Sequence, residues 1–520
     1  MSRSLSSSCQ RAPSSPDSGA TSTRSARTGA HPALYLGAEP ARGGGAASAY
    51  ELPSHHLVTH GVVVGMTGSG KTGLLTVLVE EALRAKVPVL MIDVKGDLPN
   101  LLLSLPDFEP ATLASWLPDA QELGEAAALE KATRLVAERR ANLEQWGITP
   151  RAVQRYAESI AVRVITPGTS AGESLHVLSP LERRSPRWDD DPELARATLS
   201  AAISLVLRLV GREPDPAKSR EHVFLSVAAE RRLLARQPSD LGALLEDLEN
   251  PPFEQIGALP VDRFLPKKAR RDLAAALNSL LASPTFSSWR QGAPLDVASW
   301  MKPVPAAASS SSASAPAPGA ERAPTRTPAT IVSVAHLDDD ERALVLGMVL
   351  EEVLSWVRGL PGAQSLRALI VFDEVFGFLP PHPASPPTKR PLVALMKQAR
   401  AFGVGVVVAT QNPMDLDYRA LSNAGLWCIG RLQTEADRKR LVEGMHLAHG
   451  ENPTDYDHVL KHLEPRMFLV RNAHHRGPPR LVQPRWAMSY LRGPMTRSEL
   501  RRVMPRAHPR GPGARPGGSC

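Results

Sequence analysis

Cysteine, aromatic side chains and long apolar runs are scarce in this 520-residue chain. The three cysteines, Cys9, Cys428 and Cys520, lie far apart and form no CxxC pair. This spacing argues against a disulfide framework or a zinc finger and favours a reducing, cytoplasmic location. No apolar run approaches the roughly 18 residues of a membrane-spanning helix, so no membrane partner is expected.

The N-terminal stretch MSRSLSSSCQRAPSSPDSGA lacks the apolar core of a secretory signal. Its Arg- and Ser-rich composition fits a transit peptide and a disordered tail equally well.

The excess of positive charge is concentrated at the two ends of the chain. Residues 1–48 carry five Arg against two acids, and residues 496–520 carry six Arg against one Glu. These two segments account for the whole net charge of +8, so the remaining body is close to neutral. A basic chain is typical of nucleic-acid binding, but here any contact of the body with DNA must come from local patches.

Low-complexity sequence marks three segments that we expect to be unpacked. Residues 1–48 are predicted to be a disordered tail, 303–328 a flexible linker, and 496–520 a basic, disordered tail, because each is rich in Ser, Ala, Gly, Pro or Arg without periodicity.

Short runs of β-branched residues bounded by turn residues are typical of buried parallel strands, and helical stretches separate most of them. The runs are 61–65, 87–93, 330–337, 368–374, 404–410 and 426–432. They predict an α/β fold with a doubly wound, mainly parallel sheet. Residues 49–100 and 329–495 are predicted to form its two parts, and the mostly helical 101–302 to form one inserted domain.

The sequence GMTGSGKT at 65–72 matches the phosphate-binding P-loop GxxxxGK[ST] in full, with a strand before it and a helix after it. Its glycines let backbone N–H groups surround phosphate oxygens at the positive end of the helix. Lys71 is expected to reach the β- and γ-phosphates of ATP, and the Thr72 hydroxyl to bind Mg²⁺. The predicted nucleotide-binding residues are Gly65, Met66, Thr67, Gly68, Ser69, Gly70, Lys71 and Thr72.

Two acids follow the buried run LIVF at the carboxyl end of another strand, where open α/β sheets bind ligands. Asp373 is predicted to hold Mg²⁺, and Glu374 to polarise the attacking water as the catalytic base. The nearby VKGD at 94–97 lacks the first residue of the guanine-reading motif, so a GTPase is not expected. Asp93 and Asp97 are interpreted as strand-end acids near the nucleotide.

The run VVVATQNP ends in Gln411, an unusual residue for the end of a buried strand. P-loop ATPases with an acidic DE pair carry an extra strand between the P-loop strand and the acidic strand. If residues 404–410 form it, Gln411 emerges between Lys71 and Glu374, where a neutral amide can sense the γ-phosphate. The alternative is a turn residue that caps Asn412 and Pro413.

Together, THGVVVGMTGSGKTGLL, MIDVKGDL, LIVFDE, KQARAFGVGVVVATQNP and RWAMSYLRGP resemble the HerA/FtsK-type ATPases, a ring-forming, DNA-pumping branch of the P-loop proteins. The resemblance is strongest to bacterial HerA-like ATP-binding proteins with a large helical insert. It implies a RecA-like core, ATP and Mg²⁺ as cofactors, a homo-oligomeric hexamer, and double-stranded DNA in the pore. A nuclease or another protein is a further candidate partner.

The resemblance also implies an arginine finger on or after the strand that follows the sensor glutamine. Arg431 is the predicted finger, Arg438 and Arg440 are weaker candidates, and Arg400 is another candidate on the phosphate side. The segment before the P-loop is too short for the N-terminal barrel of many HerA proteins. The groups His55, His56, His60 and His474, His475 lack a Cys or acidic partner at ligand spacing, so they are interpreted as structural or solvated.

These observations predict an ATPase that translocates or remodels duplex DNA, with Glu374, Lys71, Gln411 and Arg431 as catalytic residues. The alternatives are a secretion- or conjugation-type ATPase that moves protein or nucleoprotein, and an ATP-gated scaffold. ATP turnover that rises with duplex DNA distinguishes the first from the others.

Overall fold

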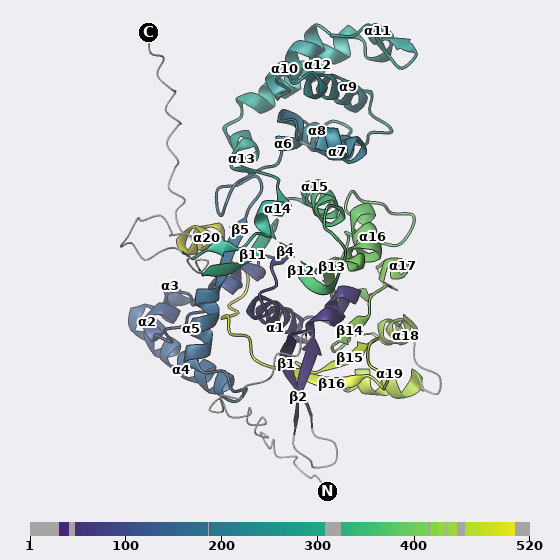
Figure 1. Ribbon diagram of the computed structural model, residues 1–520. Helices are drawn as coiled ribbons and strands as arrows, with labels where there is room; N and C mark the ends of the chain where they lie inside the picture. Colours follow the sequence, from purple (N-terminus) through teal and green to yellow (C-terminus); the bar gives the residue numbers. More distant parts are fainter. Residues whose placement is uncertain are drawn as a thin grey trace, which may run out of the picture.

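The computed structural model describes residues 31–40, 47–185, 187–306, 324–413, 416–421, 423–432, 434–444 and 453–504. Within these ranges a twelve-stranded sheet forms the centre, and helices cover both of its faces (Figure 1).

The strands of this sheet are β1 (Ala33–Glu39), β2 (Ser48–Pro53), β3 (Gly61–Val64), β4 (Val89–Asp93), β5 (Ile160–Ile165), β10 (Val304–Pro305), β11 (Thr325–Ser333), β12 (Ala363–Asp373), β13 (Phe402–Thr410), β14 (Leu426–Ile429), β15 (Phe468–Asn472) and β16 (Arg480–Pro484). Two short pairs lie outside it: β6 (Leu175–His176) with β9 (Ala293–Pro294), and β7 (Gln255–Ile256) with β8 (Leu259–Pro260).

The helices are α1 (Lys71–Arg84), α2 (Pro110–Ala114), α3 (Ala120–Leu123), α4 (Glu125–Glu144), α5 (Pro150–Ser159), α6 (Ser179–Glu182), α7 (Arg187–Asp190), α8 (Pro192–Leu209), α9 (Arg220–Leu234), α10 (Leu241–Glu249), α11 (Val261–Phe264), α12 (Lys267–Ala282), α13 (Ser287–Arg290), α14 (Val297–Trp300), α15 (Asp339–Arg358), α16 (Lys389–Gln398), α17 (Tyr418–Leu421), α18 (Glu435–Gly444), α19 (Pro453–Lys461) and α20 (Arg497–Val503). Short 3-10 segments are η1 (Ser54–Thr59), η2 (Leu98–Leu102), η3 (Pro284–Phe286) and η4 (Ala399–Ala401).

The order of the strands confirms the mainly parallel α/β sheet. It runs β10-β11-β4-β12-β13-β3-β14-β15-β16-β1-β2, with β5 also beside β11. The strands from β5 and β11 through β14 pair in parallel, whereas β10, β15, β16, β1 and β2 pair antiparallel. Each strand run predicted from the sequence lies in this sheet, and β13 separates the P-loop strand β3 from β12.

Alternating side chains of the strands pack into two separate hydrophobic cores. Val62 and Val64 face a core built with α15, α16 and α8, whereas Val63 faces a core built with α1, α4 and β1. This division follows from the period of two in a strand, which sends successive side chains to opposite faces. The P-loop strand is therefore buried on both faces.

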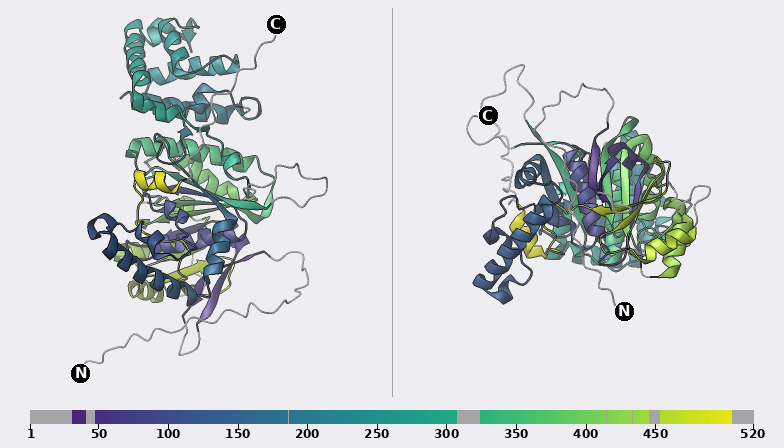
Figure 2. Two further views of the ribbon diagram at one scale, coloured as in Figure 1. Left: turned by 90° about the vertical axis from the view of Figure 1, so that its left-hand side faces the viewer. Right: turned by 90° about the horizontal axis from the view of Figure 1, so that it is seen from below.

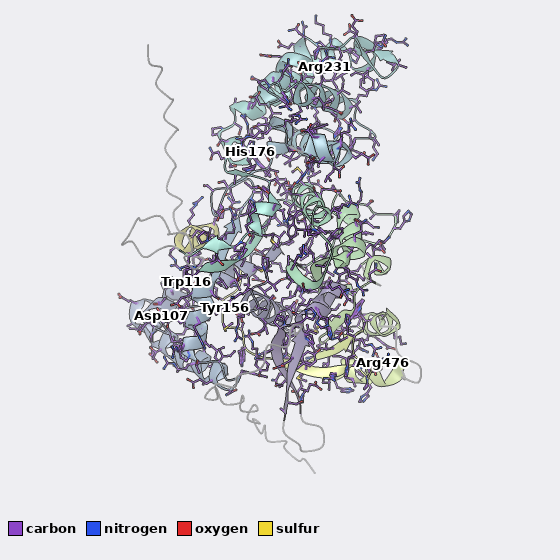
Figure 3. All side chains as sticks on the ribbon, viewed as in Figure 1. Asp107, Trp116, Tyr156, His176, Arg231 and Arg476 are labelled. Carbon is purple, nitrogen blue, oxygen red and sulfur yellow. The ribbon has the colours of Figure 1, made fainter. Side chains whose placement is uncertain are left out.

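The prediction of one inserted domain over 101–302 is wrong, because β5 returns from it to the central sheet beside β11. The strand divides the insert into two helical groups. Helices α2–α5 lie on the α1 face, and the body α6–α13 rests on α15 through α8 and extends beyond the sheet (Figures 1 and 2). Trp116 and Tyr156 mark the first group in Figure 3, and Arg231 marks the second.

The predicted tails and linker extend too far into the fold. Residues 33–39 of the predicted tail form β1, because Leu34 and Leu36 are buried and the strand pairs with β2 and β16. The two ends of the predicted linker form β10 and the start of β11, which pair antiparallel. In the predicted C-terminal tail, residues 497–503 form α20, which begins after a capping box of Thr496 and Glu499. Residues 1–30, 41–46, 307–323 and 505–520 of these predictions lie outside the described ranges.

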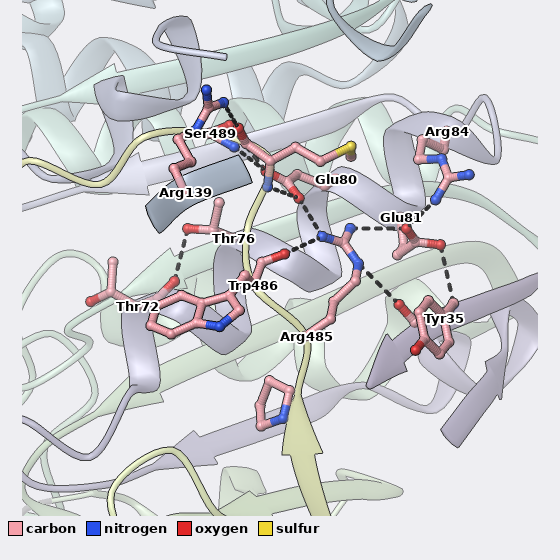
Figure 4. Close-up of polar contacts among 12 residues, drawn as sticks. Tyr35, Thr72, Thr76, Glu80, Glu81, Arg84, Arg139, Arg485, Trp486 and Ser489 are labelled. Carbon is pink, nitrogen blue, oxygen red and sulfur yellow. Dashed lines mark hydrogen bonds and ion pairs between the residues drawn. The ribbon is translucent and has the colours of Figure 1, made fainter. Parts of the chain in front are cut away.

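A buried ion-pair network holds the P-loop helix to the chain that follows β16 (Figure 4). Arg485 donates to Glu80 Oε2 and to Glu81 Oε1, both at 2.9 Å, and all three side chains are buried. Glu80 also accepts from the backbone N–H of Met488 and Ser489. Burial by itself lowers the pKa of Arg485, but the two carboxylates outweigh it and raise that pKa. Each buried charge is thus matched by a partner.

Replacing Arg485 by Ala should destabilise the core by about 3–5 kcal/mol, because it leaves Glu80 buried without a cation and leaves Glu81 with Arg84 alone. Urea unfolding followed by circular dichroism measures the loss. Arg84→Ala is the matched control, because Arg84 also pairs with Glu81 but its side chain is 46% exposed. It should cost less than ~1 kcal/mol. Equal losses in the two variants would contradict the role of the buried network.

Candidate active site

The P-loop lies between the end of β13 and the segment after β14. Gly65 N–H donates to the carbonyl of Thr410 at 3.2 Å, which fixes the start of the loop. A Cβ on Gly65 would lie 2.4 Å from Ser69 Oγ, so a larger residue does not fit there. Gly68 and Gly70 have positive φ of 79° and 92°, the region that glycine reaches without strain. Helix α1 then begins at Lys71 without an acid in its first turn, which leaves its N-terminus free for an anion.

Lys71 and the two predicted acids meet at the carboxyl edge of the sheet. Lys71 Nζ lies 3.1 Å from Glu374 Oε2 and 3.8 Å from Asp373 Oδ1. Glu374 has φ of 58°, a left-handed conformation that is costly for a residue with a Cβ. Strain of this kind is concentrated at functional sites, where the surrounding structure holds it in place.

Gln411 lies where the strand order sends it, between the P-loop and the acidic pair. Its Nε2 donates to Glu374 Oε2 at 2.8 Å, and its Oε1 accepts from Thr67 Oγ1 at 2.6 Å. Its backbone N–H donates to Glu374 Oε1 at 3.2 Å. The amide therefore connects the P-loop to Glu374, and the hydrogen bond between Thr410 and Asn412 forms the turn without the Gln411 side chain.

The ammonium groups around Glu374 keep its carboxylate charged. Burial alone would raise the pKa of Glu374, but Lys71 and Lys95 together lower it to about 2. Lys95 Nζ lies 2.6 Å from Glu374 Oε2, and the sequence reading did not assign it a role. Its position directly after β4, the neighbour of β12 in the sheet, is the signal that could have identified it.

Asp93 and Asp373 end neighbouring strands and are both buried. Asp93 Oδ2 accepts from Ser333 Oγ and its Oδ1 from Gly96 N–H, yet burial raises its pKa to about 6. Burial also raises the pKa of Asp373, and its Oδ1 has no hydrogen-bond partner in the described part of the chain.

A hard divalent cation would suit that carboxylate oxygen together with the hydroxyl of Thr72, the second residue of α1. No group of three or more His, Cys, Asp or Glu in the described ranges is arranged to hold a metal by itself. Mg²⁺ would therefore depend on phosphate oxygens for its remaining ligands.

Arg431 approaches its own P-loop through its backbone. Its carbonyl accepts from Met66 N–H at 2.9 Å, and its side chain is exposed. Its strand β14 lies beside the P-loop strand β3 and is not at the edge of the sheet, because β15, β16, β1 and β2 continue the sheet beyond β14.

The weaker arginine candidates lie away from the phosphate loop. Arg400 precedes β13 and lines a pocket with His55 and His474, at the opposite edge from Gln411. The nine residues of β13 separate the two edges by roughly 30 Å, so the prediction of a phosphate-side role for Arg400 is wrong. Arg438 is buried and donates to Asp457 at 2.9 Å, which indicates a structural role. The Arg440 side chain lies outside the described part of the structure.

The histidines gather at that same opposite edge. The rings of His56 and His474 stack with centroids 4.2 Å apart. Burial and the neighbouring histidines lower the pKa of His56 to about 4, so the stacked ring is neutral near pH 7. His60 Nδ1 accepts from Val406 N–H, in the middle of β13.

Comparison with known proteins shows which family part of this chain resembles. Residues 46–104 match the family described as "Helicase HerA-like C-terminal". This part of the core is HerA-like. The match covers β3, the P-loop, α1 and β4, and it confirms the resemblance to HerA/FtsK-type ATPases there. No curated protein matches the chain in sequence.

Three solved structures show similarity at low identity. VirB4 of Thermoanaerobacter pseudethanolicus has a TM-score of 0.45 and 14% identity, over 88% of this chain and 96% of that chain. The bacterial conjugative coupling protein TrwBdeltaN70 has a TM-score of 0.42 and 11% identity, over 86% and 90%. The genome packaging NTPase B204 from Sulfolobus turreted icosahedral virus 2, in complex with ATP-gammaS, has a TM-score of 0.23 and 13% identity, over 30% and 68%. Among the helices that the structure describes, none has the length and apolar character to cross a bilayer.

The raised pKa of Asp93 predicts a pH-dependent cost of burying its charge. Between pH 3.8 and about 6 the folded protein holds a proton that the unfolded chain releases, so stability falls as the pH rises through this window. Asp93→Asn removes the charge, and its stability relative to wild type should rise by about 2–3 kcal/mol from pH 4 to pH 7. Denaturant unfolding at both pH values measures this gain. Asp339→Asn, at a side chain that is 98% exposed, should change stability little at either pH. A constant difference between Asp93→Asn and wild type would contradict the assignment.

Proposed function

We propose that this chain is an ATP-hydrolysing motor of the HerA/FtsK type that acts on double-stranded DNA as a homo-oligomeric ring. The observation that carries the proposal is the chain of contacts Lys71–Glu374–Gln411–Thr67 at the carboxyl ends of β3, β12 and β13. It brings a P-loop lysine, a carboxylate base and a neutral sensor to one point. A nucleotide-gated scaffold has no need of the base.

The positions support a division of labour. Lys71 and the N-terminus of α1 would hold the β- and γ-phosphates of ATP, while Thr72 and Asp373 would hold Mg²⁺, which would neutralise phosphate charge. Glu374 takes a proton from the attacking water. When Lys71 turns to the phosphate, Glu374 loses one of its two ammonium partners, and the pKa of its carboxyl rises toward the value a base needs.

Gln411 acts as the sensor in this scheme. Its amide contacts both the loop that holds the γ-phosphate, through Thr67, and the base, Glu374. Loss of the γ-phosphate changes the position of Thr67 or Lys71, and the amide transmits that change to β13.

The HerA-like match of residues 46–104 and the single P-loop in the sequence support action on DNA and assembly into a ring. An arginine finger from a neighbouring subunit completes a nucleotide site of this kind. We expect the ring to be a hexamer. ATP turnover measured with and without duplex DNA, together with native mass, tests the proposal. A monomer whose turnover ignores DNA would overturn both the ring and the DNA substrate, while ATP hydrolysis would stand.

Glu374→Gln should bind ATP with near wild-type affinity but hydrolyse it ~10²–10⁴-fold more slowly, because an amide cannot take the proton. Single-turnover hydrolysis and calorimetric binding separate the two effects. Glu249→Gln makes the same change at an exposed position in the body α6–α13 and should leave both unchanged. Wild-type turnover in Glu374→Gln would assign Glu374 a structural role only.

Arg431→Ala should bind ATP and assemble but hydrolyse it ~10³–10⁵-fold more slowly, the range for an arginine finger. Mixing Arg431→Ala subunits with Lys71→Ala subunits separates the two geometries. Rings that regain turnover place an intact Arg431 against the intact P-loop of a neighbour. Mixed rings that assemble and stay inactive would overturn action in trans and assign Arg431 to its own P-loop, where its carbonyl already lies.

A further inference from the structure

A pocket of about 330 Å³ opens directly beside the P-loop. Three segments that are distant in sequence form its walls: the start of α1 with Gly73, helix α4 with Leu135 and Asn142, and the chain after β16 with Trp486. We call this last segment, residues 484–491, the strap. The pocket is lined mainly by apolar surface with a few polar groups, which is typical of small-molecule sites.

The direction of the pocket from the P-loop matches the non-phosphate part of a nucleotide. P-loop N–H groups cradle the α- and β-phosphates, so the sugar and base leave the loop at the first turn of α1. Gly73 lies in that turn and lines the pocket, and a Cβ built there has no neighbour within 4 Å. A nucleotide bound at Lys71 therefore points its base toward this opening.

Arg466 gives independent support for a ligand at this place. Its backbone N–H donates to Ser69 O at 2.9 Å, and its guanidinium lies 3.3 Å from the centroid of the Trp486 ring. The side chain forms no ion pair with a carboxylate in the described ranges, and burial lowers its pKa to about 10. Its φ of 62° is the strained left-handed region for a non-glycine residue. Its Nη2 donates to the strap carbonyls of Pro484 and Arg485, at 3.0 and 3.4 Å. A strained, half-buried cation with carbonyl partners but no acid is well placed for a nucleotide.

The wall that α4 supplies carries polar groups suited to a base. Glu138 and Asn142 line the pocket, and neither side chain makes a hydrogen bond within the described part of the chain. One turn separates them on the helix, with Leu135 a turn before Glu138. A flat aromatic base with donors and acceptors at its edge matches this combination of apolar surface and amide and carboxylate groups.

Helix α4 is attached to the core beside the pocket. Arg139 donates to the carbonyls of Ser104 and Leu105 and to that of Met488 on the strap, and it stacks on Phe108. The strap in turn is tied to α1 by Arg485. Any group that fills the pocket thus contacts the core and the insert together.

We propose that this pocket is the base-and-ribose subsite of the nucleotide site, and that helix α4 of the insert forms its outer wall. The bound base then holds the first helical group of the insert against the core. This inference rests on the proposed binding of ATP at the P-loop, and it assigns a nucleotide contact to a part of the chain outside the HerA-like match, residues 46–104.

The test compares MgATP with inorganic tripolyphosphate, which offers the phosphates without a base. Leu135→Trp fills the pocket, so calorimetry should show ATP binding weakened by at least ~10-fold and tripolyphosphate binding changed by less than ~2-fold. Asn142→Ala is the milder variant, with ATP binding weakened by about 2- to 10-fold. Leu129→Trp is the matched control, because Leu129 lies on α4, is 44% exposed and does not line the pocket.

The possible failures are distinguishable. If wild type binds neither ligand, the proposed nucleotide site itself is wrong. If wild type binds both and Leu135→Trp leaves ATP affinity unchanged, the base lies elsewhere and the subsite is overturned. Hydrogen exchange then tests the link to the insert: amides of α4 should be protected by ATP and not by tripolyphosphate. Equal protection by the two ligands, or none by either, would overturn the contact between the base and α4.

Discussion

The buried ion pairs of Arg485 with Glu80 and Glu81 constrain the geometry on which the rest of the nucleotide side depends. Charges removed from water are tolerated only when their partners are held at hydrogen-bonding distance, so α1, β1 and the strap can meet in few ways. The same helix begins at the P-loop, and the same strap carries Trp486. One buried network thus fixes the position of the pocket wall that contains Trp486 relative to helix α1, which begins at the P-loop.

The order of the strands decides how the chemical groups meet. Because β13 lies between β12 and β3, Gln411 emerges between the acidic pair and the P-loop and contacts both. Glu374 accepts a left-handed backbone to point its carboxylate at Lys71, Lys95 and the Gln411 amide. The result is a charged carboxylate surrounded by donors, and Lys71 and Lys95 keep its pKa low.

The insert relates to this site in two different ways. The strand β5 joins the central sheet and so divides the insert into two helical groups. Helices α2–α5 lie on the face of α1, while α6–α13 rest on α15. Only the first group lies next to the P-loop. Helix α4 of the first group lines the pocket beside the P-loop, and none of the residues that line this pocket comes from the described body α6–α13.

Sequence by itself determined the parts of this protein that depend on neighbouring residues. The P-loop needs its glycines and Lys71 at fixed spacing, and a buried strand delivers Asp373 and Glu374 at its end, so these features were predictable residue by residue. Even the place of Gln411 followed, once a strand between β3 and β12 was assumed. Lys95, Arg466 and Trp486 were not predictable, and Arg400 was misplaced, because their positions depend on contacts across tens to hundreds of residues. These residues are placed by the path of the insert, by the return of β5 to the sheet and by the antiparallel end of the sheet. Only the packing of the whole chain decides such long-range pairings.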